Sequence, residues 1–238
     1  MASRSILVHA LAPMPRPYTL LESVPTPEGL LELRQRGERD FLLTIQGQVL
    51  MTSALRRTEI ELAQLACAAI SGRRGARVLI GGLGLGFTLR AALDALSADA
   101  RVTVAELNPV VVRWCRGPLA ILTADSLADP RVSVVERDVT KVIRDIAEAP
   151  DAPRFDAVIW DLYRGPGCGL PALENHLYGV GSVQRTHRAL NAGGVFAVWG
   201  EKRHAPFEAR LEKQHFRIER THSSVKGPKH AIYIAVKP

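Results

Sequence analysis

The sequence contains few cysteines and few aromatic residues. Its three cysteines, Cys67, Cys115 and Cys168, form no CxxC pair and show no spacing typical of metal ligands. We therefore expect no metal site, and the odd count favours reduced thiols in a cytoplasmic protein. Aromatic residues make up only 5% of the chain, which gives little support to stacking on single-stranded nucleic-acid bases.

Long apolar runs are also missing. No stretch approaches the roughly 18 apolar residues of a membrane-spanning helix, and the apolar run near the N-terminus is too short for a signal sequence. We therefore expect no membrane partner. The remaining composition, 47% hydrophobic and 23% charged over 238 residues, is that of a soluble globular protein.

Positive charge is in excess, with a formal net charge of +7. Residues 201–238 hold nine Lys or Arg against four Glu. A basic surface can bind nucleic acid or an acidic small molecule, or it can simply keep the protein soluble. Because no aromatic residues are interleaved with these charges, we favour a solvated surface and keep RNA binding as a lesser alternative.

Proline and glycine divide the N-terminal part. Residues 1–28 contain five prolines, which predicts an irregular or extended arm. Three short apolar runs follow, at residues 30–34, 40–45 and 48–51. Because Gly37 and Gly47 separate them, these runs predict a small antiparallel meander.

The next segment predicts a helix. Thr58 and Glu61 have the spacing of a capping box, with Thr58 as the N-cap of a helix that runs to about Ile70. We therefore expect two units. Residues 1–56 form the arm and the meander, and residues 57–238 form a Rossmann-like, nucleoside-binding catalytic domain.

After Gly75 the pattern alternates between strands and helices. Strands are predicted at residues 77–81, 101–106, 132–137, 155–161 and 194–200. Helices are predicted near residues 87–97, 109–116, 139–148, 182–190 and 206–214. Apolar strands separated by helices indicate a parallel sheet with helices on both faces. Two last strands, 216–221 and 231–236, have only a short connection and should pair antiparallel. The fold class is therefore α/β, with a Rossmann-like, seven-stranded mixed sheet of the class I methyltransferase type.

A glycine-rich loop follows the first of these strands. Gly82, Gly84 and Gly86 alternate with leucines, including Leu85, between the strand and a helix. Glycines at this point let the backbone approach a ligand closely. The dinucleotide fingerprint requires a further glycine where Phe87 stands, so the spacing favours a nucleoside over a pyrophosphate.

Two acidic residues end the following strands. Glu106 lies 20 residues after Gly86, where an acid can accept hydrogen bonds from both ribose hydroxyls. Asp138 follows the third strand and could accept from an adenine amino group while also capping a helix. With their neighbours Leu107 and Val139, they complete a predicted cofactor site.

In this order, the motifs resemble the spermidine-synthase (aminopropyltransferase) family and its methyltransferase-fold relatives. The resemblance rests on Gly47 with Met51-Thr-Ser, on residues 78–90 and 155–161, and on the turn at residues 191–200. It implies a cofactor of the S-adenosylmethionine type. It also implies that Asp161 is the catalytic residue, a general base at the end of its strand.

The sequence departs from the family at two positions that bear on the substrate. Leu85 stands where aminopropyltransferases carry an aspartate that holds the amino group of the cofactor. Arg164 stands where they carry a second acid that binds the amine, and a cation there would repel a polyamine. Arg164 would instead suit a carboxylate or phosphate on the acceptor. Tyr163 and Tyr178 are expected to line the acceptor pocket beside it, with Tyr178 in a loop.

Three hypotheses follow. The first is an S-adenosylmethionine-dependent methyltransferase that acts on a small or medium-sized acceptor. The second is an aminopropyltransferase of polyamine biosynthesis that uses decarboxylated S-adenosylmethionine. The third is an RNA methyltransferase, or a nucleoside-binding module without catalysis. A small sheet in front of a Rossmann-like core also suggests a homodimer.

Overall fold

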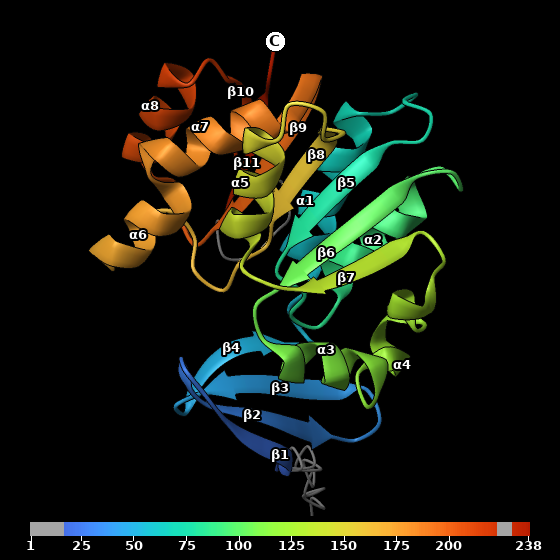
Figure 1. Ribbon diagram of the computed structural model, residues 1–238. Helices are drawn as coiled ribbons and strands as arrows, with labels where there is room; N and C mark the ends of the chain where they lie inside the picture. Colours follow the sequence, from blue (N-terminus) through green and yellow to red (C-terminus); the bar gives the residue numbers. More distant parts are fainter. Residues whose placement is uncertain (1–16, 223–229) are drawn as a thin grey trace, which may run out of the picture.

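The computed structural model describes residues 17–222 and 230–238. Most of the proline-rich arm and most of the last connection, residues 223–229, lie outside the described residues. Two sheets are stacked end to end (Figure 1). The smaller sheet has four antiparallel strands, β1 (Thr19–Thr26), β2 (Gly29–Arg36), β3 (Asp40–Ile45) and β4 (Gln48–Thr52).

The three-stranded meander is confirmed, but the sheet gains a fourth strand from the arm. Residues 1–28 were expected to form an irregular or extended arm, and residues 19–26 form the extended strand β1, which pairs with β2. Pro25 is tolerated because β1 is an edge strand, where a missing backbone donor leaves no partner unpaired on the outer side. Proline content alone did not show that this part of the arm is paired in a sheet.

The predicted capping box is also wrong in detail. Helix α1 (Arg57–Ala69) begins two residues earlier than expected, with Arg56 in place of Thr58 as its N-cap. The hydroxyl of Thr58 donates to the Glu59 carboxylate at 3.0 Å. The helix itself and its end near Ile70 are as predicted.

The larger sheet has seven strands in the order β10-β11-β9-β8-β5-β6-β7. They are β5 (Arg77–Gly81), β6 (Arg101–Glu106), β7 (Val132–Glu136), β8 (Phe155–Trp160), β9 (Leu190–Gly200), β10 (Arg217–Thr221) and β11 (Ala231–Val236). The five strands from β5 to β9 are parallel, and β11 pairs antiparallel with both β9 and β10. In this order β6 and β7 lie on one side of β5, and β8 and β9 lie on the other. The direction in which successive strands are added therefore reverses at β5. Ligands of such sheets bind at this reversal, beyond the carboxyl ends of the strands.

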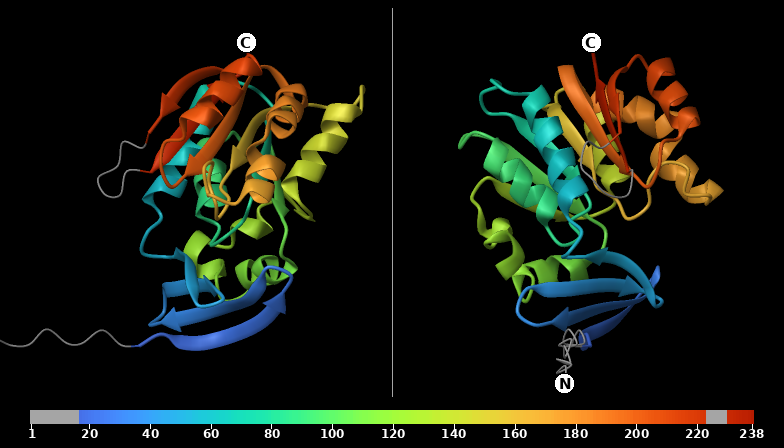
Figure 2. Two further views of the ribbon diagram at one scale, coloured as in Figure 1. Left: turned by 90° about the vertical axis from the view of Figure 1, so that its left-hand side faces the viewer. Right: turned by 180° about the vertical axis from the view of Figure 1, so that it is seen from behind.

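Helices cover both faces of the larger sheet, as the uniformly buried strand β8 requires. One face carries α1 and α2 (Phe87–Ala95), and the other carries α5 (Val139–Glu148), α7 (Val180–Ala189) and α8 (Ala205–Lys213) (Figure 2). Two separate apolar clusters fill these layers. The α/β fold with a mixed seven-stranded sheet is therefore confirmed.

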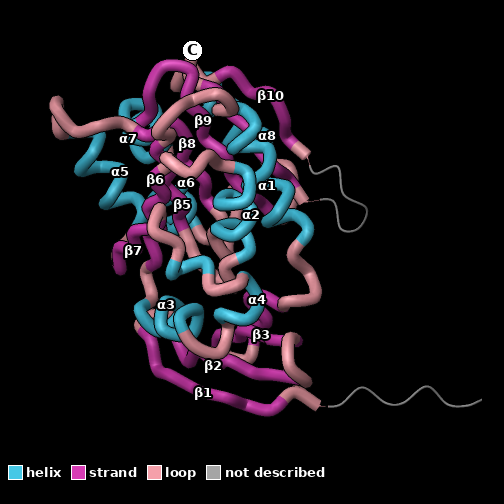
Figure 3. Tube along the Cα trace, turned by 90° about the vertical axis from the view of Figure 1, so that its right-hand side faces the viewer, coloured by secondary structure: helices cyan, strands magenta, loops and turns pink. Residues whose placement is uncertain are grey.

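Helix α3 (Pro109–Arg116) and the short α4 (Ala120–Thr123) lie against the smaller sheet (Figure 3). Glu22 on β1 accepts hydrogen bonds from Arg113, at 2.6 and 2.8 Å, and from the indole of Trp114, at 2.7 Å. Trp114 is 1% exposed and joins the apolar cluster shared by both sheets. The two sheets are thus fastened together through α3.

One predicted loop is a helix. Residues 171–178 form α6 (Pro171–Tyr178), which places Tyr178 on a helix. Pro171 at its first turn suits a helix start, because the missing N–H is one that a first turn leaves unpaired.

Other expectations stay predictions. They are the division of the chain at residue 56 and the homodimer. Within residues 17–222 and 230–238, no helix has the length and apolar character needed to span a membrane. The same residues contain no group of three or more acidic, His or Cys side chains able to hold a metal ion.

Candidate active site

The glycine loop joins β5 to α2 at the reversal of the sheet. Gly82, Gly84 and Gly86 all have positive φ, at +87°, +51° and +83°. A Cβ on Gly82 would lie 2.4 Å from the backbone oxygen of Asp161, and one on Gly84 would lie 2.3 Å from the sulfur of Met51. Glycine is required at Gly82, where the neighbour is backbone, and is favoured at Gly84 by the left-handed conformation, since the Met51 side chain there could move.

We predict that Gly82→Ala destabilises the protein and weakens nucleoside binding. The added methyl group meets the backbone at the end of β8, and the left-handed conformation adds strain. Together these cost roughly 2–5 kcal/mol. Gly75→Ala is the matched control, since Gly75 has φ +60° but open space around it. Urea unfolding should show a markedly larger loss for Gly82→Ala, and equal losses would contradict the close approach.

A cavity of about 250 Å³ opens beside this loop, between the two sheets. Its apolar wall comes from the smaller sheet and is formed by Leu31, Leu43, Ile45 and Leu50. Its polar side groups include Glu106, Asp138, Asp161 and His176, which come from the carboxyl ends of the strands and the helices that follow, and Glu28, which comes from the turn between β1 and β2. Four of these are carboxylates, and the described lining residues include no Lys or Arg. The cavity therefore suits a ligand with an apolar body and positive charge.

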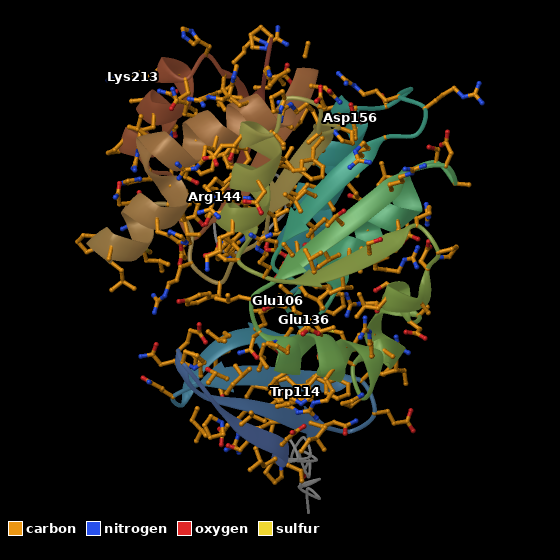
Figure 4. All side chains as sticks on the ribbon, viewed as in Figure 1. Glu106, Trp114, Glu136, Arg144, Asp156 and Lys213 are labelled. Carbon is orange, nitrogen blue, oxygen red and sulfur yellow. The ribbon has the colours of Figure 1, made fainter. Side chains whose placement is uncertain are left out.

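Glu106 ends β6 and lies at the junction of the two sheets (Figure 4). One carboxylate oxygen accepts from the backbone N–H of Leu83 and the other from that of Asn108, both at 2.8 Å. Burial raises the pKa of Glu106, and these hydrogen bonds offset only part of that effect. The contacts fix the carboxylate beside the glycine loop, and each oxygen keeps a second lone pair for a ligand hydroxyl.

Asp138 caps α5, as the sequence predicted. One oxygen accepts from the backbone N–H and the hydroxyl of Thr140, both at 2.8 Å. The other lies 2.8 Å from Nε2 of His176, which is on α6. Burial raises the pKa of Asp138, but the hydrogen bonds from Thr140 and His176 outweigh it and leave the pKa lowered. Asp138 therefore stays ionised and is held from two sides.

Asp161 follows β8 and lines the cavity beside the glycine loop, where its backbone oxygen faces Gly82. The hydroxyl of Thr88, on α2, donates to its carboxylate at 2.5 Å. Burial and the nearby charge of Glu59 raise the pKa of Asp161 to about 7, although the Thr88 hydrogen bond opposes the rise. A carboxylate with this pKa can accept a proton near neutral pH and release it again.

The structure brings most of the sequence-predicted site residues to this one cavity. Those that line it are Gly82, Gly84, Glu106, Leu107, Asp138, Val139, Asp161 and Tyr163. Four others are not among the lining residues, namely Leu85, Gly86, Arg164 and Tyr178.

The positions of these four residues have physical causes. Leu85 is fully buried in the apolar core, and Gly86 is the N-cap of α2. Tyr178 is also fully buried and donates its hydroxyl to the backbone oxygen of Arg164 at 2.6 Å. The guanidinium of Arg164 lies over the Tyr163 ring, 5.9 Å from its centre. Neither Leu85 nor Arg164 therefore provides the argument against a cationic substrate that the sequence suggested.

Sequence reasoning missed two groups that complete the site. Thr88 is two residues beyond the last loop glycine, so its place in the first turn of α2 was a usable signal. The apolar wall had no such signal, because it comes from strands of the smaller sheet that are distant in sequence from the loop.

A model of the spermine/spermidine synthase domain matches residues 62–218. This segment is well over half of the chain, and it contains the glycine loop, Glu106, Asp138 and Asp161. The chain belongs to the spermine/spermidine synthase family.

Curated relatives agree with this assignment, and solved structures agree with the fold. The polyamine aminopropyltransferase of Mycobacterium tuberculosis is 39% identical over 125 residues, which cover 52% of this chain and 23% of that protein. The polyamine aminopropyltransferase of Pectobacterium atrosepticum is 32% identical over 120 residues, covering 50% of this chain and 38% of that protein. The matched segments thus span well under half the length of these relatives.

Spermidine synthase from Thermotoga maritima has the same fold, with a TM-score of 0.70 over 92% of this chain and 73% of that structure, at 18% identity. A spermidine synthase in complex with the transition-state analogue AdoDATO gives a TM-score of 0.69 over 92% of this chain and 72% of that one, also at 18% identity. Membership of this family supports a transferase. It favours the aminopropyl alternative, and nothing in the comparisons supports methyl transfer.

Proposed function

We propose that the chain transfers an aminopropyl group from decarboxylated S-adenosylmethionine to a small amine acceptor. The observation that carries this proposal is the charge of the cavity. Its described lining includes Glu28, Glu106, Asp138 and Asp161 but no Lys or Arg. A sulfonium and an ammonium are attracted to such a lining, whereas the carboxylate of intact S-adenosylmethionine has no cationic partner there and would be repelled.

The residues present also fit the nucleoside part of this donor. Glu106 would accept hydrogen bonds from the ribose hydroxyls, and Asp138 would accept from the adenine amino group. The loop glycines would allow the backbone to approach closely, since a side chain at position 82 or 84 would meet neighbouring atoms. The donor supplies a methylene carbon activated by its positive sulfur.

Asp161 would act on the acceptor. The lone pair of a neutral amine attacks the methylene carbon as the carbon–sulfur bond breaks, and the bonding electrons leave with the sulfur of methylthioadenosine. The nitrogen then carries an additional proton, which Asp161 accepts. Thr88 orients the carboxylate by its hydrogen bond. Alignment of the nitrogen, the carbon and the sulfur would provide much of the remaining rate enhancement.

Calorimetric titration with three ligands tests this proposal. We predict that decarboxylated S-adenosylmethionine binds at least about tenfold more tightly than S-adenosylmethionine, a difference of about 1.4 kcal/mol. Methylthioadenosine should bind as well, because it carries the nucleoside. Asp138→Asn is the control variant, since it should weaken all three ligands by a similar factor without changing their order.

The opposite order has a clear meaning. Tighter binding of S-adenosylmethionine would show that the protein recognises the carboxylate, and aminopropyl transfer would be rejected. Binding of none of the three ligands would reject the nucleoside site itself.

A further inference from the structure

A second groove, of about 360 Å³, lies where α1 and α2 meet the smaller sheet, on the face shown at the right of Figure 2. It does not share a lining residue with the cavity around Asp161. Three arginines, Arg39, Arg56 and Arg90, contribute to its lining. Apolar side chains, including those of Ile60 and Leu122, contribute the rest. The groove therefore combines positive charge with an apolar surface.

Two packed helices build this groove. Ile60 and Gln64 are four residues apart on α1, so they lie on one face of that helix. On α2, Phe87, Arg90 and Asp94 recur at spacings of three and four residues, which also places them on a single face. Regular elements carry most of the lining residues, whereas Arg39 comes from the turn before β3 and Arg56 is the N-cap residue of α1.

The arginines keep donors available for a ligand. Among the described residues, the Arg39 guanidinium has no hydrogen-bond or ion-pair partner. Arg56 donates to the backbone oxygen of Ser53 at 3.2 Å, and its guanidinium lies 5.5 Å from the centre of the Phe87 ring. A guanidinium has five N–H donors, so Arg56 retains most of them.

The third arginine and the nearby acids are partly paired. Arg90 binds Asp94 through Nη2 at 2.5 Å, while its buried Nε has no hydrogen-bond partner. Asp94 is 66% exposed, which weakens its hold on Arg90 through solvent screening. Asp129, the other acid near Arg90, is bound to Arg131 at 2.8 Å. A net positive charge therefore remains at the groove.

We propose that this groove binds a small phosphate monoester whose organic part is apolar or aromatic. The planar forks of Arg39 and Arg56 match phosphate oxygens, which guanidinium groups bind in pairs. The organic part would pack on Ile60, Ala91 and Leu122. The site is independent of the transferase reaction and remains if the proposed donor is wrong.

Calorimetry at low salt on the full chain tests the proposal with phenyl phosphate, inorganic phosphate and phenol. Phenyl phosphate should bind at a single saturable site, more tightly than either of the other two. Arg39→Gln combined with Arg56→Gln should weaken it at least about tenfold. Arg101→Gln is the matched control, because Arg101 is exposed at the start of β6, has the same charge and lies outside the groove. Arg101→Gln should bind phenyl phosphate as tightly as the wild-type protein. The arginine substitutions should also leave the binding of methylthioadenosine unchanged.

Other results would overturn the proposal. One is the absence of saturable phenyl phosphate binding. Another is an equal loss of affinity in Arg101→Gln, which would mean nonspecific attraction. A third is displacement of phenyl phosphate by methylthioadenosine, which would place phenyl phosphate in the cavity around Asp161. If the double variant does not fold, Arg39→Gln alone provides the test, since its guanidinium has no partner to lose.

Discussion

Asp161→Asn is expected to slow transfer strongly and to leave nucleoside binding intact. Asparagine has the same shape as aspartate and can still accept the hydrogen bond from Thr88, but it cannot take a proton from the acceptor amine. The loss of a general base lowers the rate by about 10²- to 10⁴-fold. The measurement is the rate of methylthioadenosine release, with calorimetry on methylthioadenosine as the control for an intact site.

The pH dependence of the same reaction identifies the base. Asp161 acts when it is ionised, so kcat/KM of the wild-type protein should rise as the pH increases through about 7. The charge of Glu59 raises the pKa of Asp161, and Glu59→Gln should therefore move this rise to lower pH. A profile that does not change in Glu59→Gln, or full activity in Asp161→Asn, would exclude Asp161 as the base.

The second large effect is on stability. The pKa of Asp161 is about 7 in the folded protein, against an ordinary value of 3.8. Between these values the folded state binds more protons than the unfolded state, so the stability contribution of Asp161 is lost as the pH rises. Above pH 7 the ionisation of Asp161 lowers the free energy of unfolding by an amount on the order of 4 kcal/mol, relative to its value at low pH. Asp161→Asn removes this cost.

Urea unfolding at several pH values measures this effect. Asp161→Asn should exceed the wild-type protein in stability by up to about 4 kcal/mol at pH 8, and the difference should disappear near pH 4. Asp151→Asn is the control, since Asp151 is exposed. Parallel profiles of stability against pH for the wild-type protein and Asp161→Asn would mean that folding does not raise the pKa of Asp161. Ionisation of the catalytic carboxylate would then cost the folded protein no stability.

The sequence was informative where function depends on local order along the chain. The loop glycines, Glu106 and Asp138 each follow a strand, and parallel strands bring their carboxyl ends to one edge of the sheet. Their convergence on one cavity could therefore be foreseen. The strands of the larger sheet, the terminal hairpin and most helices also follow from apolar periodicity, which decides which face of each element is buried.

The direction in which a side chain points within a motif could not be predicted from the sequence in the same way. Leu85 lies between two glycines with positive φ, and this backbone directs its side chain into the core. Arg164 does not line the cavity, and contacts distant in sequence fix the backbone around it. Tyr178 binds its backbone oxygen, and the next residue, Gly165, donates to Glu201 at 3.0 Å. Substitutions at Leu85 and Arg164 were therefore weak guides to the substrate.

The most direct test of the proposed function is a turnover assay with both donors. The full chain is incubated with a panel of small diamines and either decarboxylated S-adenosylmethionine or S-adenosylmethionine, and the nucleoside product is identified by mass spectrometry. We predict methylthioadenosine together with an aminopropylated amine from the decarboxylated donor, and turnover at least about 10²-fold slower in Asp161→Asn. Formation of S-adenosylhomocysteine from the intact donor, with no methylthioadenosine from the other, would contradict it.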